Sequence, residues 1–367
     1  MNRRIIVHFP FKINKGRAAA SQLRPQKIIA AFEELGYEIF LIEGEAADRN
    51  HQMKSIKRAI KSGVHFDFMY SESSTLPTLM TEKHHFPTHP SLDFSLFRFC
   101  KKRHIPIGLF YRDIYWCFPE NNKGVIRKFM RYFYLYDLYE YNKYVSTLFV
   151  PSFEMVEHIP YSLKMPVHEL YPGCEVKTPN VEKNNSKKNH VNILYVGGIG
   201  HHYNVSMILD VVKKVPQVHL TLCCRPDDWK GAKSEYEKYL GDNVSVVHKS
   251  GKELEQLYAE ADLFCLYVRP DKYREFAVPF KLFETIGYGC PVLASEGTWV
   301  AKFVKQNRAG FTCEYSPKAL KALLEQLNAH TEDIKLARTF VSQIRNENNW
   351  EARCKKIEDV LLNINEL

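Results

Sequence analysis

The chain has 367 residues, of which 45% are hydrophobic and 25% charged, a composition that excludes a disordered or fibrous protein. This length exceeds the size at which a single hydrophobic core stops growing, so we expect two domains. The formal net charge of +9 favours an anionic partner without identifying it.

Two features of the sequence predict a cytoplasmic protein. The nine cysteines are scattered and form no C-x-x-C pair of zinc spacing, which indicates reduced thiols. The apolar run Ile5-Ile6-Val7 is too short for a signal peptide and lacks a small-residue cleavage site, so it reads as a first strand. No stretch of about 20 apolar residues suggests a membrane span.

The first half of the chain alternates strand and helix patterns. Its first helix is expected from about Arg24 to Leu35, closed by Gly36. Strands are expected at 4–10, 37–44, 66–71, 105–111 and 146–152. This alternation predicts an α/β fold with a parallel sheet covered by helices on both faces.

A polar stretch, 177-KTPNVEKNNSKKNH-190, interrupts the alternation and is rich in Asn, Lys and Ser. The pattern then restarts, with strands expected at 191–200, 218–224, 244–249, 262–268 and 291–295. We therefore predict a first Rossmann-like domain (1–172), a linker (173–190), a second Rossmann-like domain (191–340) and a final helix (341–367) long enough to return to the first domain. The carboxyl ends of the two sheets, where ligands bind in such folds, are expected to face each other across a cleft.

Candidate ligand-binding residues follow four strands of the second half. The turn Gly197-Gly198-Ile199-Gly200 lets the backbone approach a phosphate, and a helix is expected to follow it. The turn lacks the last glycine of a dinucleotide fingerprint, and a tight turn without a ligand explains it equally well. Arg225 and Arg269 each follow a strand and suit a phosphate, although a solvated loop arginine is the alternative.

Two further signals concern a nucleotide. Ser250, in the turn Lys249-Ser250-Gly251, offers backbone groups to a base edge, and plain turn residues would look the same. In 276-FAVPFKLFETIGYGCPVLA-294 a helix is entered at Pro279, and Lys281 and Glu284 share one face because they are three positions apart. An exposed ion pair is the alternative, but the apolar surroundings favour a ligand, since buried charges are costly unless satisfied.

The segment 275-EFAVPFKLFETIGYGCPVLAS-295, preceded by 191-VNILYVGGI-199, resembles the nucleotide-sugar half of GT-B glycosyltransferases, most closely the family-4-like retaining group. That group shows a strand ending in V-G-G or V-G-R, then an acidic residue, P-x-K-x-x-E and small-x-G-x-P-V. The resemblance implies that Glu284 holds the donor ribose, Lys281 the diphosphate and Glu275 the sugar hydroxyls. It also implies that the helix with Trp350 packs back onto the N-terminal domain.

The sequence departs from this pattern in two places. Phe276 stands where the group has its first acid and is a donor-binding candidate at that position, and Glu275 is one position early. The Arg…Lys pair that binds phosphate in that group is replaced by residues 201–203, two histidines and a tyrosine. The charge of the diphosphate must then be balanced by Arg225, Arg269, Lys272 or Lys281. No D-x-D motif occurs, so we predict a transferase without metal or cofactor, in which protein dipoles and cations stabilise the leaving nucleotide. UDP is the favoured carrier and GDP the alternative.

Acceptor residues are expected in the first half. Arg112 and Asp113 follow a strand and suit an acceptor anion and hydroxyl, with a mutual salt bridge as the alternative. Glu72 ends another strand and suits a polar acceptor, although a plain capping turn would also explain the polar residues of this segment. Four polar residues of the region after the first strand belong to the same expected cleft, namely Lys15, Arg17, Ser21 and Arg24.

The stretch from Arg98 to Tyr144 carries ten Lys/Arg and four acids, and therefore most of the net charge. Within it, 123–144 predicts a basic aromatic helix that either contacts an anionic membrane or packs in the core. We expect a glycan or lipid-linked acceptor in bacterial polysaccharide or glycoconjugate assembly, and no nucleic acid because no recognition motif accompanies the charge. A nucleotide-sugar 2-epimerase and a non-catalytic nucleotide-sugar-binding partner are the alternative functions.

Overall fold

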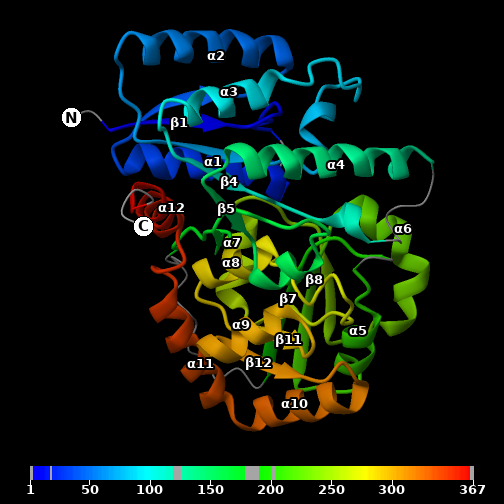
Figure 1. Ribbon diagram of the computed structural model, residues 1–367. Coiled ribbons are helices and arrows are strands. Elements are labelled where there is room, and N and C mark those ends of the chain that lie inside the picture. Colours follow the sequence, from blue (N-terminus) through cyan, green and yellow to red (C-terminus); the bar gives the residue numbers. More distant parts are fainter. Residues whose placement is uncertain (1–2, 17–18, 119–124, 178–189, 201–202, 364–367) are drawn as a thin grey trace. The chain divides into compact units, whose positions relative to one another are not determined.

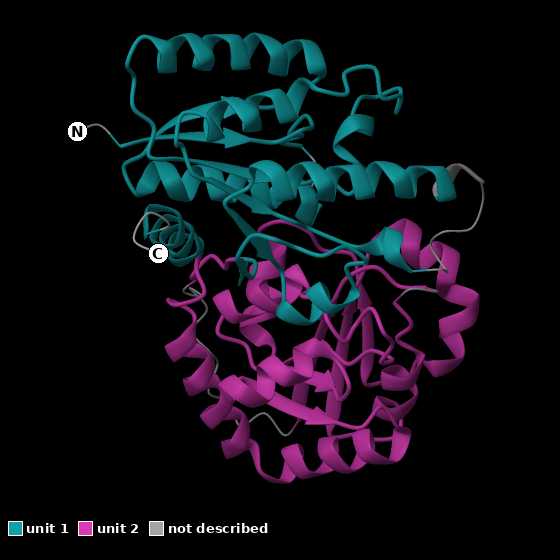
Figure 2. Cartoon of the chain, in the orientation of Figure 1, with its two compact units in different colours: residues 1–172, 350–367 teal, residues 173–349 magenta. Residues whose placement is uncertain are grey.

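The computed structural model describes residues 3–16, 19–118, 125–177, 190–200 and 203–363, without the side chains of 125–127. The chain forms two compact units (Figure 1). Unit 1 comprises residues 1–172 with 350–367, and unit 2 comprises 173–349 (Figure 2). The chain therefore returns to the first unit at Trp350, later than the predicted boundary at 341.

Unit 1 contains a six-stranded parallel sheet of order β2-β1-β3-β4-β5-β6. Its strands are β1 (Arg4–His8), β2 (Glu38–Ile42), β3 (Phe68–Glu72), β4 (Ile107–Phe110), β5 (Thr147–Val150) and β6 (Val167–Glu169). The first five match the prediction, whereas the three-residue β6 was not expected. The order reverses between β1 and β3, which is where an open α/β sheet places its ligands.

The helices of unit 1, except the last, connect consecutive strands as a parallel sheet requires. They are α1 (Ala20–Glu34), α2 (Ala46–Lys61), α3 (Leu92–Lys101), α4 (Val125–Tyr144) and α12 (Trp350–Leu362), with short turns η1 (Thr78–Met80), η2 (Tyr115–Cys117) and η4 (Phe153–His158). α12 packs against α1 and β4. A Cβ at Gly108 would lie 2.9 Å from Leu361 Cδ1, so glycine on β4 permits the close approach of α12.

Unit 2 contains a second six-stranded parallel sheet, of order β12-β11-β10-β7-β8-β9. Its strands are β7 (Val191–Val196), β8 (Val218–Cys223), β9 (Val244–Val247), β10 (Leu263–Leu266), β11 (Val292–Ser295) and β12 (Gly310–Cys313). This is the doubly wound Rossmann order, with its reversal between β7 and β10. Only β12 was not predicted.

The helices of unit 2 are α5 (Ser206–Val212), α6 (Pro226–Tyr236), α7 (Glu253–Glu260), α8 (Phe280–Gly287), α9 (Trp299–Asn307), α10 (Pro317–Ala329) and α11 (Thr331–Ile344), with the turn η5 (Glu237–Tyr239). Part of the predicted linker, 173–177, packs on α8. Lys177 N donates to Gly287 O at 3.0 Å, and a Cβ at Gly287 would lie 2.2 Å from Glu175 O. Residues 178–189 of that linker lie outside the described residues. The two sheets confirm the predicted α/β class with two Rossmann-like sheets.

Candidate functional site

The predicted ligand-binding residues of unit 2 gather at one edge of its sheet. Because β7, β8, β9 and β10 are neighbours and parallel, their carboxyl ends lie at the same edge. The loops that leave this edge carry Gly197 and Gly198, Arg225, Ser250, and Arg269. α8 is part of the connection from β10 to β11 and carries Lys281 and Glu284.

The glycine turn after β7 is closed by hydrogen bonds within unit 2. Gly197 N donates to Cys223 O at 3.1 Å, and the Tyr195 hydroxyl donates to Gly198 O at 2.6 Å. The helix expected after the turn is α5, which begins at Ser206. The turn therefore offers backbone groups to a ligand without the field of an adjoining helix N-terminus.

The polar side chains at the other three strand ends are exposed. Arg225 is the residue before α6, and Arg269 follows β10 with its carbonyl accepting from Arg274 Nη1 at 2.8 Å. Glu253 N donates to Ser250 O at 3.2 Å in the turn that begins α7. Both guanidinium groups are thus available at this edge, and their roles toward a phosphate stay predictions.

The central feature of this edge is the carboxylate of Glu284 on α8. Lys281 Nζ lies 2.7 Å from Glu284 Oε2, and the Tyr258 hydroxyl donates to Glu284 Oε1 at 3.3 Å. The side chains of Lys281 and Glu284 are 34% and 26% exposed, so the pair is half-buried and open to solvent. The ion pair considered as an alternative is therefore present, but it lies in a partly buried position that a ligand can reach.

Tyr258, on α7, was not anticipated from the sequence. Its buried ring stacks on Tyr288 at 4.1 Å between ring centroids and on Phe264 at 5.4 Å. Burial, and then the charge of Glu284, raise the pKa of its hydroxyl well above the usual value, so it remains a neutral donor. The ring stack thus fixes the hydroxyl that orients Glu284.

The remaining two predicted donor residues precede α8. Glu275 is exposed, and its backbone N–H donates to Asp271 O at 3.2 Å. Phe276 is buried, and its ring packs edge-on against Tyr273 at 5.1 Å. A contact between a sugar and Glu275 stays a prediction, whereas Phe276 has only its backbone to offer a donor.

In unit 1, the buried carboxylate of Glu72 lies at the carboxyl end of β3, beside the point where the strand order reverses. Arg24 Nε lies 2.9 Å from Glu72 Oε1, and Arg112 Nη2 lies 2.9 Å from Glu72 Oε2. The Tyr70 hydroxyl also donates to Oε1, at 2.8 Å. Two guanidinium groups share one carboxylate, which leaves one positive charge in this cluster.

Arg112 is engaged by the protein in a second way. Pro25 lies inside α1 and has no N–H, so the carbonyl of Ser21 lacks its helical partner and accepts from Arg112 Nη1 at 3.2 Å instead. Asp113 accepts from the N–H groups of Ile114 at 2.6 Å and Tyr115. The described ion pair of Arg112 is thus with Glu72, and Asp113 accepts from the backbone of the turn that begins η2.

The residues predicted for the cleft after the first strand have different environments in the structure. Lys15 is exposed, whereas Arg24 is buried within α1 and not in a loop. The helix starts four residues earlier than expected, at Ala20. Arg17 lies outside the described residues. Among the described residues, the carboxyl edge of unit 1 thus has a buried ionic core, and Lys15 is exposed in the loop beside it.

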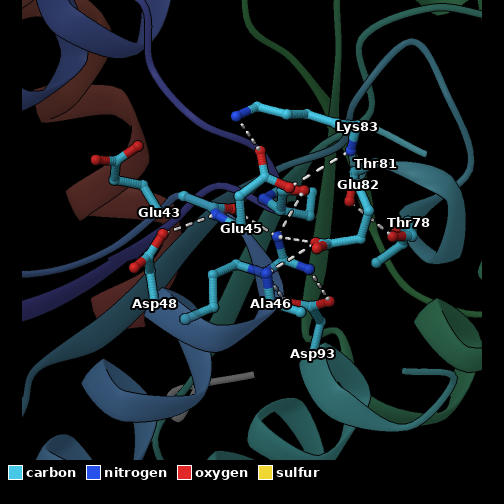
Figure 3. A network of polar contacts seen from close by, with 12 residues as sticks. Glu43, Glu45, Ala46, Asp48, Thr78, Thr81, Glu82, Lys83 and Asp93 are labelled. Carbon is cyan, nitrogen blue, oxygen red and sulfur yellow. Dashed lines mark hydrogen bonds and ion pairs between the residues drawn. The ribbon is translucent and has the colours of Figure 1, made fainter. Parts of the chain in front are cut away.

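A second polar network fixes the long connection between β3 and α3 (Figure 3). Glu82 Oε1 accepts from the Ala46 N–H at 2.8 Å and lies 3.3 Å from Arg49 Nη1. Arg49 Nε lies 3.0 Å from Asp93 Oδ1, and His8 Nε2 lies 2.9 Å from the same atom. Burial alone would raise the pKa of Asp93, but His8 and then Arg49 lower it below its usual value. The connection is therefore held to α2 and α3 by charged groups that are largely removed from solvent.

The basic aromatic segment 123–144 forms α4 from Val125, and residues 123–124 lie outside the described part. In its C-terminal half Leu138 and Tyr141 are buried and Asp137 Oδ2 accepts from Thr78 N at 2.8 Å, whereas Tyr139 is 47% exposed. In the N-terminal half, Phe129 and Tyr132 are 60% and 70% exposed. Core packing therefore does not account for the exposed aromatic residues of this helix. Across the described ranges, we find no helix with both the length and the apolar character to span a membrane.

Residues 176–347 match the model of the family described as glycosyl transferases group 1, and this range covers almost all of unit 2. Unit 2 is a group 1 glycosyltransferase domain. The resemblance to GT-B glycosyltransferases is thereby confirmed. A search of curated protein sequences found no match.

Solved structures with the same two-sheet fold cover nearly the whole chain. HepE of Anabaena, solved with UDP and glucose, is 14% identical, with a TM-score of 0.63 over 98% of this chain and 99% of its own. Sucrose-phosphate synthase of Thermosynechococcus elongatus is 12% identical, with a TM-score of 0.62 over 98% of each chain. WaaG, a glycosyltransferase involved in lipopolysaccharide biosynthesis, is 14% identical, with a TM-score of 0.55 over 97% of this chain and 99% of its own. These likenesses show that the fold is GT-B.

Proposed function

We propose that this glycosyltransferase moves a hexose from a UDP-sugar to an acceptor hydroxyl with retention of configuration. The observation that carries the proposal is the half-buried Lys281–Glu284 pair on the first turns of α8, within a group 1 glycosyltransferase domain. The structure of HepE with UDP and glucose supports a UDP-sugar as the donor.

The roles of the two charged groups follow from their positions. Glu284 presents a carboxylate that accepts charge-assisted hydrogen bonds from two ribose hydroxyls. Lys281 stands at the second residue of α8, where an ammonium and the positive end of the helix dipole both favour a diphosphate. When the donor binds, Lys281 Nζ leaves Glu284 and contacts a phosphate oxygen, and the ribose hydroxyls donate to the carboxylate of Glu284 in its place.

The chemistry at the sugar requires stabilisation of the departing diphosphate. We assign this to Lys281 with Arg225 and Arg269, which are exposed at the same edge of the sheet. The leaving phosphate accepts the proton of the acceptor hydroxyl, so no side-chain base is needed, and Glu275 holds the sugar hydroxyls. The cations take the place of a divalent ion, consistent with a sequence that has no D-x-D motif.

The acceptor is assigned to unit 1, where Asp113 and the exposed Lys15 flank the carboxyl edge of the sheet. Because the Arg112 guanidinium is held by Glu72 and Ser21, its contribution is to fix the loop that carries Asp113. We propose a glycan or lipid-linked acceptor of a bacterial polysaccharide or glycoconjugate, used in the cytoplasm at the inner face of the membrane.

The donor is tested by thermal unfolding with UDP, GDP, ADP and their sugars, because a ligand of the native state must raise the unfolding temperature. We expect the largest shift from UDP and a UDP-sugar, followed by donor turnover with an acceptor. Epimerised donor without acceptor, detected by NMR, would instead identify an epimerase. UDP binding without turnover across acceptors would identify a binding partner, and the absence of any shift would refute nucleotide recognition.

Membrane contact is assigned to the exposed aromatic residues of α4. Flotation with vesicles containing anionic lipid should carry the protein upward, and Phe129→Ser with Tyr132→Ser should abolish this. Phe86→Ser is the control, since Phe86 is an exposed aromatic residue (67%) outside α4. Equal flotation of both variants and wild type, or no flotation of wild type at low salt, would remove the assignment.

A further inference from the structure

A basic pocket lies on unit 1, at the ends of α3 and α4, which run beside each other (Figure 1). Its volume is about 440 Å³, and it is lined by Arg98, Lys101, Lys102, Lys143 and Tyr144. α3 ends before β4 begins and α4 ends before β5 begins, so the pocket lies at the amino-terminal edge of these strands. The predicted acceptor residues lie at the opposite, carboxyl-terminal edge.

The positive charge of this pocket is poorly compensated. Lys143 Nζ lies 2.8 Å from Glu140 Oε1, and Lys101 Nζ donates to Lys143 O at 2.6 Å. Within the described ranges, Arg98 and Lys102 have no ion pair, although both stand at the end of α3 four positions apart. Like charges at this spacing repel each other. The dipole of α3 favours a cation at its C-terminus, but it does not account for four cations in the lining, of which Lys143 has a carboxylate partner.

The chemistry of the lining indicates the ligand. Arg98, Lys101 and Lys102 are exposed, while Lys143 and Tyr144 are partly buried, so the cations rim a hollow that solvent can reach. A guanidinium group with several ammonium groups suits a phosphate carrying more than one negative charge.

We propose that this pocket binds a multiply charged phosphate group, supplied either by a soluble phosphorylated compound or by a phospholipid head group. The pocket lies in unit 1, outside the residues 176–347 that match the glycosyltransferase family. Its binding is independent of the donor site, and its loss leaves UDP recognition intact.

The test compares two charge-matched double variants of the full chain. Arg98→Gln with Lys102→Gln removes two cations from the pocket, and Lys230→Gln with Lys318→Gln removes two exposed lysines from unit 2. Tripolyphosphate is titrated by calorimetry into each protein at low salt and in saturating UDP, which occupies the donor site. We expect the pocket variant to bind at least about tenfold more weakly than wild type, since two charge-assisted contacts are lost. The unit 2 variant should match wild type.

Equal tripolyphosphate binding by all three proteins, or equal weakening in both variants, would overturn the proposal in favour of a net-charge effect. Vesicles containing phosphatidic acid then separate the two sources. Binding that depends on Arg98 and Lys102 indicates a lipid head group, and binding that does not depend on them indicates a soluble phosphate. An RNA oligonucleotide is the last probe. Pocket-dependent RNA binding without tripolyphosphate binding would refute the proposal and identify a nucleic-acid surface.

Discussion

Replacement of Glu284 by alanine should separate ligand binding from stability. The Lys281–Glu284 pair is 34% and 26% exposed, and ion pairs at this exposure contribute less than about 1 kcal/mol to folding. The variant also leaves the Tyr258 hydroxyl without its acceptor, at a cost of about 1 kcal/mol. Together these losses lower the unfolding temperature of a unit of this size by only a few degrees, roughly 2–4 °C per kcal/mol.

The expected effect on binding is much larger. Two charge-assisted hydrogen bonds from ribose hydroxyls to a carboxylate contribute about 1.5 kcal/mol or more each. Their loss raises the dissociation constant for UDP by about 10²-fold or more, since 1.4 kcal/mol corresponds to a factor of ten. Glu284→Gln keeps an oxygen that accepts from Tyr258 and should show an intermediate loss with wild-type stability.

The assay is calorimetric titration of UDP together with thermal unfolding of the free proteins. A matched control exists on α11, where Lys335 Nζ lies 2.7 Å from Glu332 Oε1 in an exposed pair of the same three-residue spacing. Glu332→Ala should leave UDP affinity unchanged. The reasoning is refuted if Glu284→Ala binds UDP as wild type does, or if Glu332→Ala loses the same affinity.

Three further predictions concern the buried groups. Tyr258→Phe removes the hydroxyl that orients Glu284, so the affinity for UDP should fall about fivefold while the affinity for 2′,3′-dideoxy-UDP stays unchanged. An equal loss of affinity for both ligands would show a merely structural role. Glu72→Gln leaves two guanidinium groups in largely buried positions without their counter-ion, so chemical denaturation should show a loss of about 3–5 kcal/mol, and a loss below 1 kcal/mol would contradict the buried cluster. Burial raises the pKa of Asp137 to about 8, so between about pH 4 and 8 the folded state holds a proton that the unfolded state has released. Over this window the stability of wild type should fall by about 1.4 kcal/mol per pH unit relative to Asp137→Asn, and parallel pH profiles of the two proteins would refute the assignment.

Most of the fold follows from local sequence patterns. Ten strands were predicted because each presents a short apolar run between turn residues, as 291–295 does. β6 (Val167–Glu169) and β12 (Gly310–Cys313) were not predicted, because their residues are all only partly buried and neither forms an apolar run. They pair at the outer edges of the sheets, where one neighbouring strand suffices to define them.

The site was predictable where its residues are close in sequence. The three-residue spacing of Lys281 and Glu284 placed both on one helical face, and the structure shows them in contact. Tyr258 reaches Glu284 across 26 positions, and its surroundings are those of any core tyrosine. In the same way, no local pattern indicates that Arg112 contacts Glu72, which lies 40 positions earlier in the chain. Contacts of this kind depend on which strands become neighbours, which the sequence patterns do not specify.

The most direct test of the account compares UDP with 2′,3′-dideoxy-UDP, which lacks both ribose hydroxyls, on wild type and on Glu284→Ala. If Glu284 holds the ribose, wild type should bind UDP about 10²-fold more tightly than the dideoxy compound, and the variant should bind the two equally. Equal affinity of wild type for the two nucleotides would contradict the claim that α8 recognises a nucleotide through this carboxylate.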